Sequence, residues 1–332
     1  MKVAIITEGG GDLGFGHITR CTALYQAFAA KNINPGFFIN LTQKVKLSLP
    51  IKNIQVFNWL ENRKNLFTFI KNYDIALIDS YQADTDFYNQ LAETVKKCAY
   101  LDDFRRINYP PGLVINPTIN ISKDHHTHKK NLIYLLGPKY ITLRKAFWTK
   151  SQKKINENIN SILITFGGND VCNLSPLVLN FFTKKYPDFI KNVIIGGGYR
   201  NVDKIVKLKD KKTNLIIHPD AQKMKNIMIS SDIAISSGGQ TLYELANVGL
   251  PTLGLCIADN QLSNLEGFKD IGFIKYLGWY SDKNIIDKLQ TRLHNLDYET
   301  RKNMHSVGQK YVDGLGAKRI VSYLFRNKDI FN

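Results

Sequence analysis

Short apolar runs alternate with amphipathic segments along most of the chain. The runs have the length and composition of buried strands, and the segments between them repeat their apolar positions at helical spacing. The expected strands cover residues 3–7, 36–39, 75–79, 161–166, 193–197, 214–218, 232–236 and 251–257. The expected helices begin near residue 17 and cover residues 84–97, 174–184 and 240–248. This alternation predicts βαβ units, and therefore an α/β fold with parallel sheets.

The alternation weakens over residues 102–150, where we expect irregular structure. This stretch holds Pro110, Pro111, Pro117, Pro138 and the polar segment HHTHKK at 125–130. Because the pattern restarts at residue 161, a domain boundary is expected near residues 148–160. We therefore expect an N-terminal Rossmann-like domain over residues 1–150 and a C-terminal Rossmann-like domain over residues 151–332, each with a doubly wound parallel sheet.

The end of the chain, residues 282–325, has apolar positions at helical spacing. They are Ile285, Leu289, Leu293, Ile320, Val321 and Leu324. The last helix is a candidate to cross back to the N-terminal domain. Ligands of open parallel sheets bind at the carboxyl ends of the strands, so a crevice shared by the two sheets is the expected place for function.

The length of 332 residues agrees with about two domains, and 44% hydrophobic with 22% charged residues is an ordinary globular composition. The net charge of +17 favours anionic partners such as nucleic acid, phosphorylated metabolites or acidic lipid. Residues 1–150 carry 20 Lys and Arg against 11 Asp and Glu, and residues 151–332 carry 25 against 17. The excess is spread evenly at +9 and +8, with no basic arm, so a Lys-rich surface is favoured over a nucleic-acid partner.

The four cysteines are far apart and form no C-x-x-C pair, which indicates neither a zinc site nor a redox motif. The first apolar run is too short for a signal-peptide core, and the uncharged stretch 245–258 is too short to span a bilayer. We expect a cytoplasmic protein without an integral membrane segment. His125, His126 and His128 lie in a polar segment beside lysines and are expected to be solvated, with no metal bound.

A glycine-rich segment, residues 8–17, follows the first strand. It contains G-x-G-x-x-G at Gly9, Gly11 and Gly14, but no Asp or Glu occurs between Asp12 and Glu61 to bind a ribose. Nicotinamide dinucleotide chemistry is therefore disfavoured. His17 would lie in the first helical turn, where the helix dipole disfavours imidazolium, so it is either a general base or a packing or capping residue.

A second segment of small residues, 236–244, joins an expected strand to an expected helix. Its amide groups and the helix dipole suit a diphosphate. Glu244, one turn into the helix, either accepts hydrogen bonds from a diol such as ribose or is a solvated helix residue. The loop 165–170 either faces the same crevice or is an ordinary turn, and residues 196–198 are interpreted as a turn. No nucleophile elbow or Walker lysine is present, so covalent catalysis is not indicated.

Eight motifs distributed over nearly the whole chain resemble the UDP-sugar hydrolases of pseudaminic acid biosynthesis. They are GFGHITR (14–20), LIDSYQ (77–82), YLDD (100–103), INP (115–117), GPKYITLR (137–144), TFGGND (165–170), SSGGQTLYELANVGLP (236–251) and DGLGAKRI (313–320). The block at 236–251 is shared with the wider peptidoglycan N-acetylglucosaminyltransferase type. The resemblance implies a GT-B architecture, with two Rossmann-like domains facing a central cleft and UDP held mainly by the C-terminal one.

The resemblance also implies a reaction. Members of this family hydrolyse UDP-2,4-diacetamido-2,4,6-trideoxy-β-L-altropyranose to UDP and the free sugar, a precursor of a nonulosonic acid used in flagellin glycosylation. Water attacks the anomeric carbon with inversion, and neither a metal nor a cofactor is required. A GT-B glycosyltransferase that uses a hydroxyl acceptor, and a non-catalytic nucleotide-sugar or nucleic-acid binding protein, are the alternatives. Oligomeric state is not indicated.

The family's functional residues map onto this chain by motif. His17 is the candidate base, and Tyr81 is its neighbour that positions water or sugar. The substrate-binding candidates are Gly14, Gly16 and Arg20 in the first domain, and Gly167, Gly168, Asn169, Ser237, Gly238, Gly239, Thr241, Glu244, Asn260 and Gln261 in the second. Of these, Gly238, Gly239 and Thr241 would bind the diphosphate. Glu244 would bind the ribose, and the 167–169 loop, Asn260 and Gln261 the sugar. Ser80 stands where family members often have His, so any duty of that His has no counterpart here.

Overall fold

The computed structural model describes residues 1–42, 49–121 and 131–326. The chain forms two compact units. The first comprises Met1–Lys145 and the chain from Leu315 onward, and the second comprises Ala146–Gly314. The C-terminal helix α11 (Gly316–Arg326) thus belongs to the same unit as the N-terminal strand, although the whole second unit lies between them in sequence.

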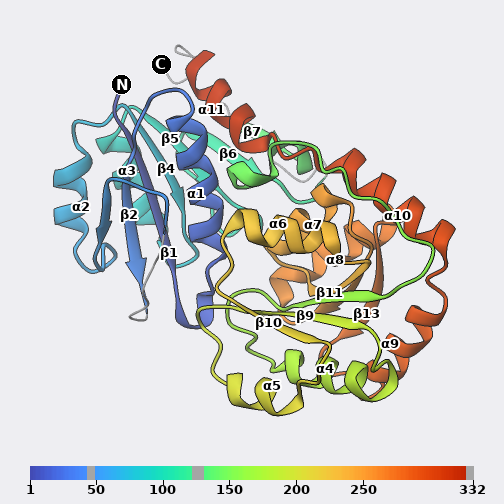
Figure 1. Cartoon of the computed structure of the whole chain (residues 1–332). Helices are drawn as coiled ribbons and strands as arrows, with labels where there is room; N and C mark the ends of the chain where they lie inside the picture. The colour runs from blue at the N-terminus through green and yellow to red at the C-terminus, as the bar shows by residue number, and fades with distance from the viewer. Residues whose placement is uncertain (43–48, 122–130, 327–332) are drawn as a thin grey trace. The chain divides into compact units, whose positions relative to one another are not determined.

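The first unit holds, within its described residues, a seven-stranded parallel sheet (Figure 1). Its strands are β1 (Val3–Gly9), β2 (Gly36–Leu41), β3 (Ile54–Val56), β4 (Ile75–Asp79), β5 (Lys97–Leu101), β6 (Gly112–Asn116) and β7 (Leu132–Leu136). They are ordered β3-β2-β1-β4-β5-β6-β7, and every neighbouring pair is parallel. The chain leaves β1 in one direction and returns to its other side at β4, so the sheet is doubly wound.

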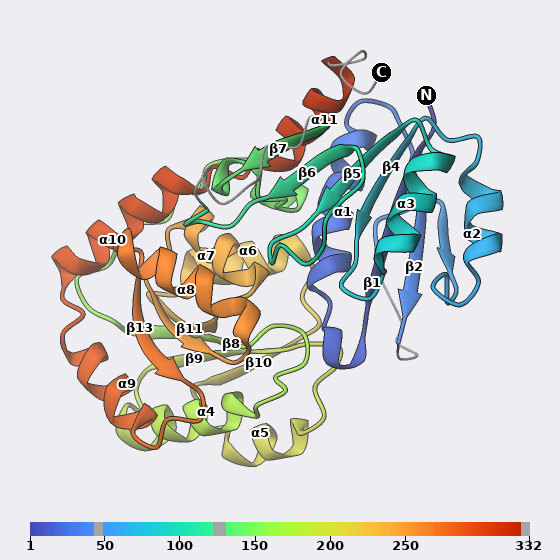
Figure 2. The same cartoon turned by 180° about the vertical axis from the view of Figure 1, so that it is seen from behind.

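Helices cover both faces of this sheet (Figure 2). The helices α2 (Arg63–Ile70) and α3 (Thr85–Thr94) lie on one face, and α1 (Gly16–Ala29) and α11 lie on the other. Burial of apolar side chains between α2, α3 and the sheet provides the main stabilisation of that face. Its core includes Trp59, Phe87 and Tyr88, each fully buried. Asp84 starts α3 by accepting a hydrogen bond from the Phe87 amide, as an N-cap aspartate does.

The second unit repeats this arrangement with a six-stranded parallel sheet among its described residues. The strands are β8 (Ser161–Thr165), β9 (Ile190–Ile195), β10 (Thr213–Ile217), β11 (Ile233–Ser237), β12 (Thr252–Cys256) and β13 (Ile274–Trp279). Their order is β10-β9-β8-β11-β12-β13, again doubly wound and parallel throughout. The helices are α4 (Leu174–Lys185), α5 (Val202–Leu208), α6 (Ala221–Ser230), α7 (Gln240–Val248), α8 (Asp259–Asp270), α9 (Ile285–His294) and α10 (Tyr298–Tyr311).

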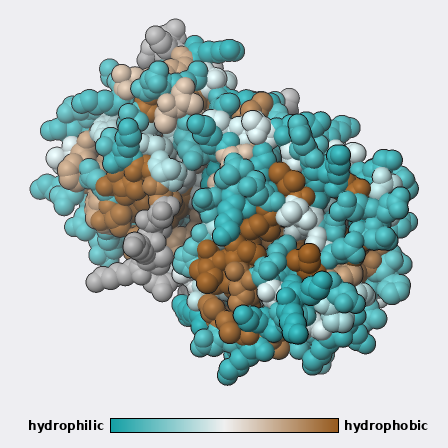
Figure 3. Space-filling model, in the orientation of Figure 1, coloured by the Kyte–Doolittle hydropathy of each residue, from teal (hydrophilic) through white to brown (hydrophobic). Residues whose placement is uncertain are grey.

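The surface drawn in Figure 3 is mostly hydrophilic, with hydrophobic side chains gathered in a few places. Large exposed hydrophobic residues include Val56 and Phe69 in the first unit and Val171 and Ile217 in the second. Among the described residues, none of the helices has the length and hydrophobicity that crossing a membrane would require.

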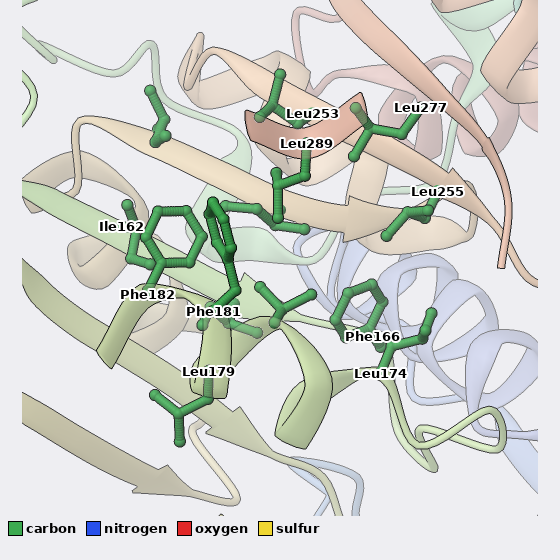
Figure 4. Packing of buried hydrophobic residues seen from close by; sticks show 14 of the residues in the cluster. Ile162, Phe166, Leu174, Leu179, Phe181, Phe182, Leu253, Leu255, Leu277 and Leu289 are labelled. Atoms are coloured by element: carbon green, nitrogen blue, oxygen red, sulfur yellow. The ribbon is translucent and has the colours of Figure 1, made fainter. Parts of the chain in front are cut away.

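The core of the second unit lies between α4, α9 and one face of the sheet (Figure 4). In this cluster Phe182 of α4 points toward Ile162 of β8, and Leu289 of α9 lies near Leu253 of β12. These side chains are at most 1% exposed. The fixed core holds the strand ends of this unit in place, and the candidate binding loops follow those ends.

The expectation of irregular structure over residues 102–150 is wrong for two stretches, because β6 and β7 add two parallel strands there. The prolines bound these strands and do not interrupt them: Pro110 and Pro111 precede β6, and Pro117 follows it. Proline is tolerated at such positions because it breaks no ladder hydrogen bond there. The helix expected over 84–97 ends at Thr94, since β5 begins at Lys97.

Candidate functional site

The candidate site residues cluster at the switch point of each doubly wound sheet, where two neighbouring strands continue to opposite faces. In the first unit the switch lies between β1 and β4, and in the second between β8 and β11. Loops after such strands diverge and leave room for a ligand. His17 follows β1 and Tyr81 follows β4, whereas Gly167 follows β8 and Gly238 follows β11.

The loop between β1 and α1 is held by glycines. Gly10, Gly11 and Gly14 have φ angles of 94°, 49° and 69°, which side-chain-bearing residues rarely adopt. The amide of Gly10 donates to the carbonyl of Gly14 at 2.8 Å, which closes a tight turn. A Cβ atom built on Gly14 or Gly16 would meet nothing within 4 Å. The backbone at these two positions therefore borders open space, which suits a residue that a ligand approaches closely.

His17 lies in the first turn of α1 and contacts Asp79 at the end of β4. Its Nδ1 atom is 2.6 Å from Oδ1 of Asp79, and both residues are buried. Burial disfavours the charged carboxylate, but the nearby Arg20 and His17 outweigh it and lower the pKa of Asp79 to about 2. Nη2 of Arg20 also lies 2.9 Å from Nδ1, but it donates to Asp79. An ionised carboxylate can only accept, so the shorter contact to Asp79 assigns the proton to Nδ1. A neutral His17 then has its lone pair on Nε2, the nitrogen available to accept a proton.

Arg20 lies one turn after His17 on α1 and joins two carboxylates. Its Nε and Nη2 atoms donate to Oδ2 and Oδ1 of Asp79, both at 2.9 Å. This is the bidentate geometry of a guanidinium–carboxylate pair. Its Nη1 atom donates to Asp103, in the loop after β5. Burial opposes the charge, but Asp103 and Asp79 raise the pKa of Arg20 well above its usual value. Arg20 thus stays cationic and fixes both carboxylates.

Tyr81 is held at both of its ends. Its hydroxyl donates to Oδ1 of Asp103 at 2.6 Å, and its ring meets the His17 ring edge-on with centroids 4.4 Å apart. Its amide donates to Glu8, at 2.6 Å. Burial opposes ionisation of Asp103, but Arg20 and the Tyr81 hydroxyl lower the pKa of that carboxyl group. The structure therefore brings three candidates together: His17, Tyr81 and Arg20.

Ser80, the departure from the family pattern, has a contact of its own. Its hydroxyl donates to Glu8 at 2.6 Å and accepts from the amide of Ala83 at 2.9 Å. Glu8 and Ser80 are both buried. The pair ties the end of β1 to the loop after β4, and so holds the backbone from which Tyr81 extends.

The sequence interpretation missed three members of this cluster: Asp79, Asp103 and Glu8. Asp79 and Asp103 stand in the quoted motifs LIDSYQ and YLDD, and Glu8 opens the glycine-rich segment. The available signal was that each is an acidic residue at the carboxyl end of an apolar run, where a charge is costly unless it is paired.

In the second unit, the loop after β8 packs on the loop after β9. The amide of Gly198 donates to the carbonyl of Gly168 at 2.9 Å. A Cβ atom on Gly196 would lie 2.3 Å from that carbonyl oxygen, so glycine is needed there. Asp170 accepts from two amides at the start of α4, and burial raises its pKa. Residues 196–198, interpreted from sequence as a turn, thus also support the loop that carries Asn169.

The loop between β11 and α7 is held by α8. The amide of Gly238 donates to Oε1 of Gln261 at 3.0 Å, and Asn264 donates to the carbonyl of Gly238 at 3.1 Å. Helix α7 follows Gly239 with no side-chain cap and no acidic residue in its first turn. The positive end of this helix is therefore not offset by a local carboxylate, which suits an anion.

The remaining candidates of the second unit differ in burial. Glu244 is only 2% exposed, which excludes the solvated alternative. Ser237 is buried at the end of β11, Thr241 is half-buried, and Asn260 is exposed near the start of α8. The structure thus joins Gly238 to Gln261 by a hydrogen bond, whereas Asn260, the residue before Gln261 on α8, is exposed.

Among the residues that the structure describes, no group of His, Cys, Asp and Glu is arranged to hold a metal ion. His125, His126 and His128, interpreted as solvated, lie outside the described residues.

No family model matches the chain. The chain is 28% identical over 308 residues to an uncharacterised protein of Methanocaldococcus jannaschii, across 89% of this chain. It is 24% identical over 336 residues to the spore coat polysaccharide biosynthesis protein SpsG of Bacillus subtilis, across 98% of each chain. It is 25% identical over 281 residues, 83% of this chain, to a Helicobacter pylori protein named pseudaminic acid cytidylyltransferase and UDP-2,4-diacetamido-2,4,6-trideoxy-beta-L-altropyranose hydrolase. The chain spans 63% of the length of the Methanocaldococcus protein and 48% of the Helicobacter protein.

Solved structures resemble the chain over nearly its full length. Acinetobacter baumannii MurG superposes with a TM-score of 0.65 at 12% identity, covering 98% of this chain and all of that one. The UDP-GlcNAc 2-epimerase of Neisseria meningitidis, solved with UDP-GlcNAc, gives 0.62 at 17% identity with the same coverage. At these identities the likeness shows the fold alone. The chain has the GT-B fold, with two Rossmann-like parallel-sheet units, which confirms the fold class expected from the sequence.

Proposed function

We propose that the protein processes a UDP-sugar, and specifically that it hydrolyses UDP-2,4-diacetamido-2,4,6-trideoxy-β-L-altropyranose to UDP and the free sugar. The observation that carries this proposal is the buried His17–Asp79 contact at the switch point of the first sheet. The name of the Helicobacter pylori relative supports the substrate. Solved neighbours that hold UDP or UDP-GlcNAc support the nucleotide-sugar class.

In the proposed reaction, Nε2 of His17 takes a proton from water as the water oxygen bonds to the anomeric carbon. The bond from that carbon to the diphosphate oxygen breaks, UDP leaves with the bonding electrons, and the sugar configuration inverts. His17 then returns the proton to solvent. UDP is a good leaving group, so the catalytic demand is to orient one water molecule and to stabilise the developing diphosphate charge.

The proposed binding roles are divided between residues of the first unit and residues of the second. Gly14 and Gly16 border open space near His17, so the substrate can approach their backbone. Gly238, Gly239 and Thr241 would hold the diphosphate at the start of α7.

The remaining roles fall to side chains and loops around that helix. Glu244 would hold the ribose, and the 167–169 loop with Asn260 and Gln261 would contact the sugar. No metal or cofactor takes part in the proposal.

A glycosyltransferase is the second candidate, because the Bacillus subtilis relative is named for polysaccharide biosynthesis and matches over 98% of both chains. In that reaction His17 would deprotonate a sugar hydroxyl in place of water. The two candidates therefore differ in their acceptor.

The experiment is a UDP-release assay on the full chain with the UDP-diacetamido sugar and no acceptor. We expect steady turnover by the natural protein and a loss of about 10²- to 10⁴-fold in kcat for His17→Ala, the range of general base catalysis. His294→Gln, at an exposed histidine of α9, is the matched control and is expected to match the natural protein. Absence of UDP release from a protein that binds UDP would reject the hydrolase and direct the search to acceptors.

A further inference from the structure

We propose that Asp103 is a positioning residue for His17, acting through Tyr81 and Arg20. The proposal rests on the proposed function, in which His17 is the base. Asp103 lies beyond the end of β5, and no role was assigned to it from the sequence. Its carboxylate hydrogen-bonds to Arg20 and Tyr81, and its charge also acts on His17 directly. The effect of Asp103 on the orientation of the His17 ring passes through the two side chains that it binds.

The contacts among the five side chains close into a ring. His17 contacts Asp79 at 2.6 Å, and Asp79 accepts from Nε and Nη2 of Arg20 at 2.9 Å. Arg20 reaches Asp103, which accepts the Tyr81 hydroxyl at 2.6 Å. The aromatic ring of Tyr81 contacts the imidazole of His17, with their centroids 4.4 Å apart and an interplanar angle of 85°. Arg20 also contacts His17 directly, with Nη2 at 2.9 Å from Nδ1, and Asp103 closes the ring between Arg20 and Tyr81.

The ring fixes His17 from two directions. Asp79 sets which nitrogen carries the proton, and the Tyr81 ring limits rotation of the imidazole plane. Loss of Asp103 leaves the first restraint in place, because Arg20 keeps both hydrogen bonds to Asp79. It weakens the second, because the Tyr81 hydroxyl loses the carboxylate of Asp103 as an acceptor. Asp103 therefore acts on the orientation of the base and not on its tautomer.

The experiment compares kcat and KM of Asp103→Ala with those of the natural chain. A misoriented base slows the chemical step with little change in ground-state binding, so we expect kcat to fall about 10²-fold while KM stays within about threefold. In a Tyr81→Phe background, Asp103→Ala should cost less than about threefold, since coupled residues are not additive. Two results would overturn the proposal, provided that the natural protein is active. One is an equal loss of kcat from Asp103→Ala in both backgrounds, and the other is a kcat of Asp103→Ala that equals that of the natural protein.

A second readout needs no substrate and separates this proposal from the proposed function. The Tyr81 ring current shifts the His17 ring protons in the NMR spectrum of the full chain. Asp103→Ala should move these resonances toward their positions in Tyr81→Ala. Asp84→Asn removes the charge from an exposed aspartate that binds Arg63 at 2.7 Å, and it should leave them in place.

Unmoved His17 resonances in Asp103→Ala contradict the positioning role whatever the activity. If the resonances move in Asp103→Ala but the natural protein shows no turnover, the positioning role is supported and the hydrolase is rejected. If Asp103→Ala does not fold, Asp103→Asn serves the same comparison. It retains an oxygen for Tyr81 but sets an amide against Arg20, and the predicted kcat loss is then smaller than that of Tyr81→Phe.

Discussion

The Nδ1 atom of His17 lies 2.6 Å from Oδ1 of Asp79, across 62 positions of sequence. The two residues meet because β1 and β4 are neighbours in the sheet, with Thr7 paired to Asp79. Burial of both side chains strengthens the hydrogen bond and makes an unpaired partner costly. The contact therefore links the topology of the sheet to the protonation state of the candidate base.

Replacement of Asp79 by Asn should reverse the tautomer of His17. The amide nitrogen can donate to Nδ1, which moves the imidazole proton to Nε2 and removes the lone pair that accepts a proton from water. We expect kcat to fall by about 10²- to 10⁴-fold, and the ¹⁵N spectrum of His17 to show the Nε2–H tautomer. An Asp79→Asn variant with normal kcat would mean that His17 is not the base.

Acid should destabilise the fold partly through Asp79. Its folded pKa of about 2 lies below the unfolded value of about 4, so Asp79 contributes stability above pH 4 and loses it as the pH falls toward 2. The shift corresponds to about 2 kcal/mol. Urea unfolding at pH 5 and pH 3 should show a smaller loss of unfolding free energy in Asp79→Asn than in the natural chain. An equal loss in the two proteins would show that Asp79 is not tightly paired.

Ser80 should stabilise the loop that carries Tyr81. Ser80→Ala leaves Glu8 with a buried carboxyl oxygen that has lost its donor, so we expect a loss of about 1–3 kcal/mol in unfolding free energy. We also expect a lower kcat, because Glu8 binds the Tyr81 amide. Ser306→Ala, on the exposed side of α10, is the control and should change stability by less than about 0.5 kcal/mol. Similar losses in the two variants would remove the assigned role of Ser80.

Alanine substitutions at Gly196 and Gly198 should have different effects. The first should lower the stability of the fold, and the second should weaken binding of the sugar. A Cβ atom on Gly196 meets the backbone of Gly168 at 2.3 Å, so Gly196→Ala should lower the unfolding free energy by about 1–3 kcal/mol. The atoms nearest to a Cβ atom on Gly198 belong to the side chain of Asn169, with Oδ1 at 2.1 Å, and a side chain can give way more easily than backbone. Gly198→Ala should therefore retain most of its stability and raise the KM for the UDP-sugar. A normal KM would indicate that Asn169 does not contact the sugar.

The elements that sequence predicted best are the buried parallel strands. Strands such as β4 and β8 are continuous apolar runs because both faces of a parallel sheet are covered. The strands β6 and β7 were missed because prolines outside them suggested a loop. The glycine loops and His17 were visible because their positions between a strand and a helix carry a local signal.

Asp79 and Asp103 were not assigned because their roles depend on which strands are neighbours. The β1–β4 pairing joins segments separated by two other strands, and no local pattern reports it. The same reason applies to Glu8, whose partner Ser80 lies 72 positions away. A parallel-sheet prediction gives the direction of the strands but not their order. The order places Asp79 against His17 and Glu8 against Ser80.

The decisive measurement is an NMR time course of hydrolysis in water enriched with ¹⁸O, using the UDP-diacetamido sugar without metal or acceptor. We predict that the first free sugar has the inverted anomeric configuration, that ¹⁸O enters its anomeric oxygen and not UDP, and that His17→Ala abolishes the signal. Label in the phosphate of UDP, retention of configuration, or full activity of His17→Ala would contradict water attack at the anomeric carbon with His17 as the base.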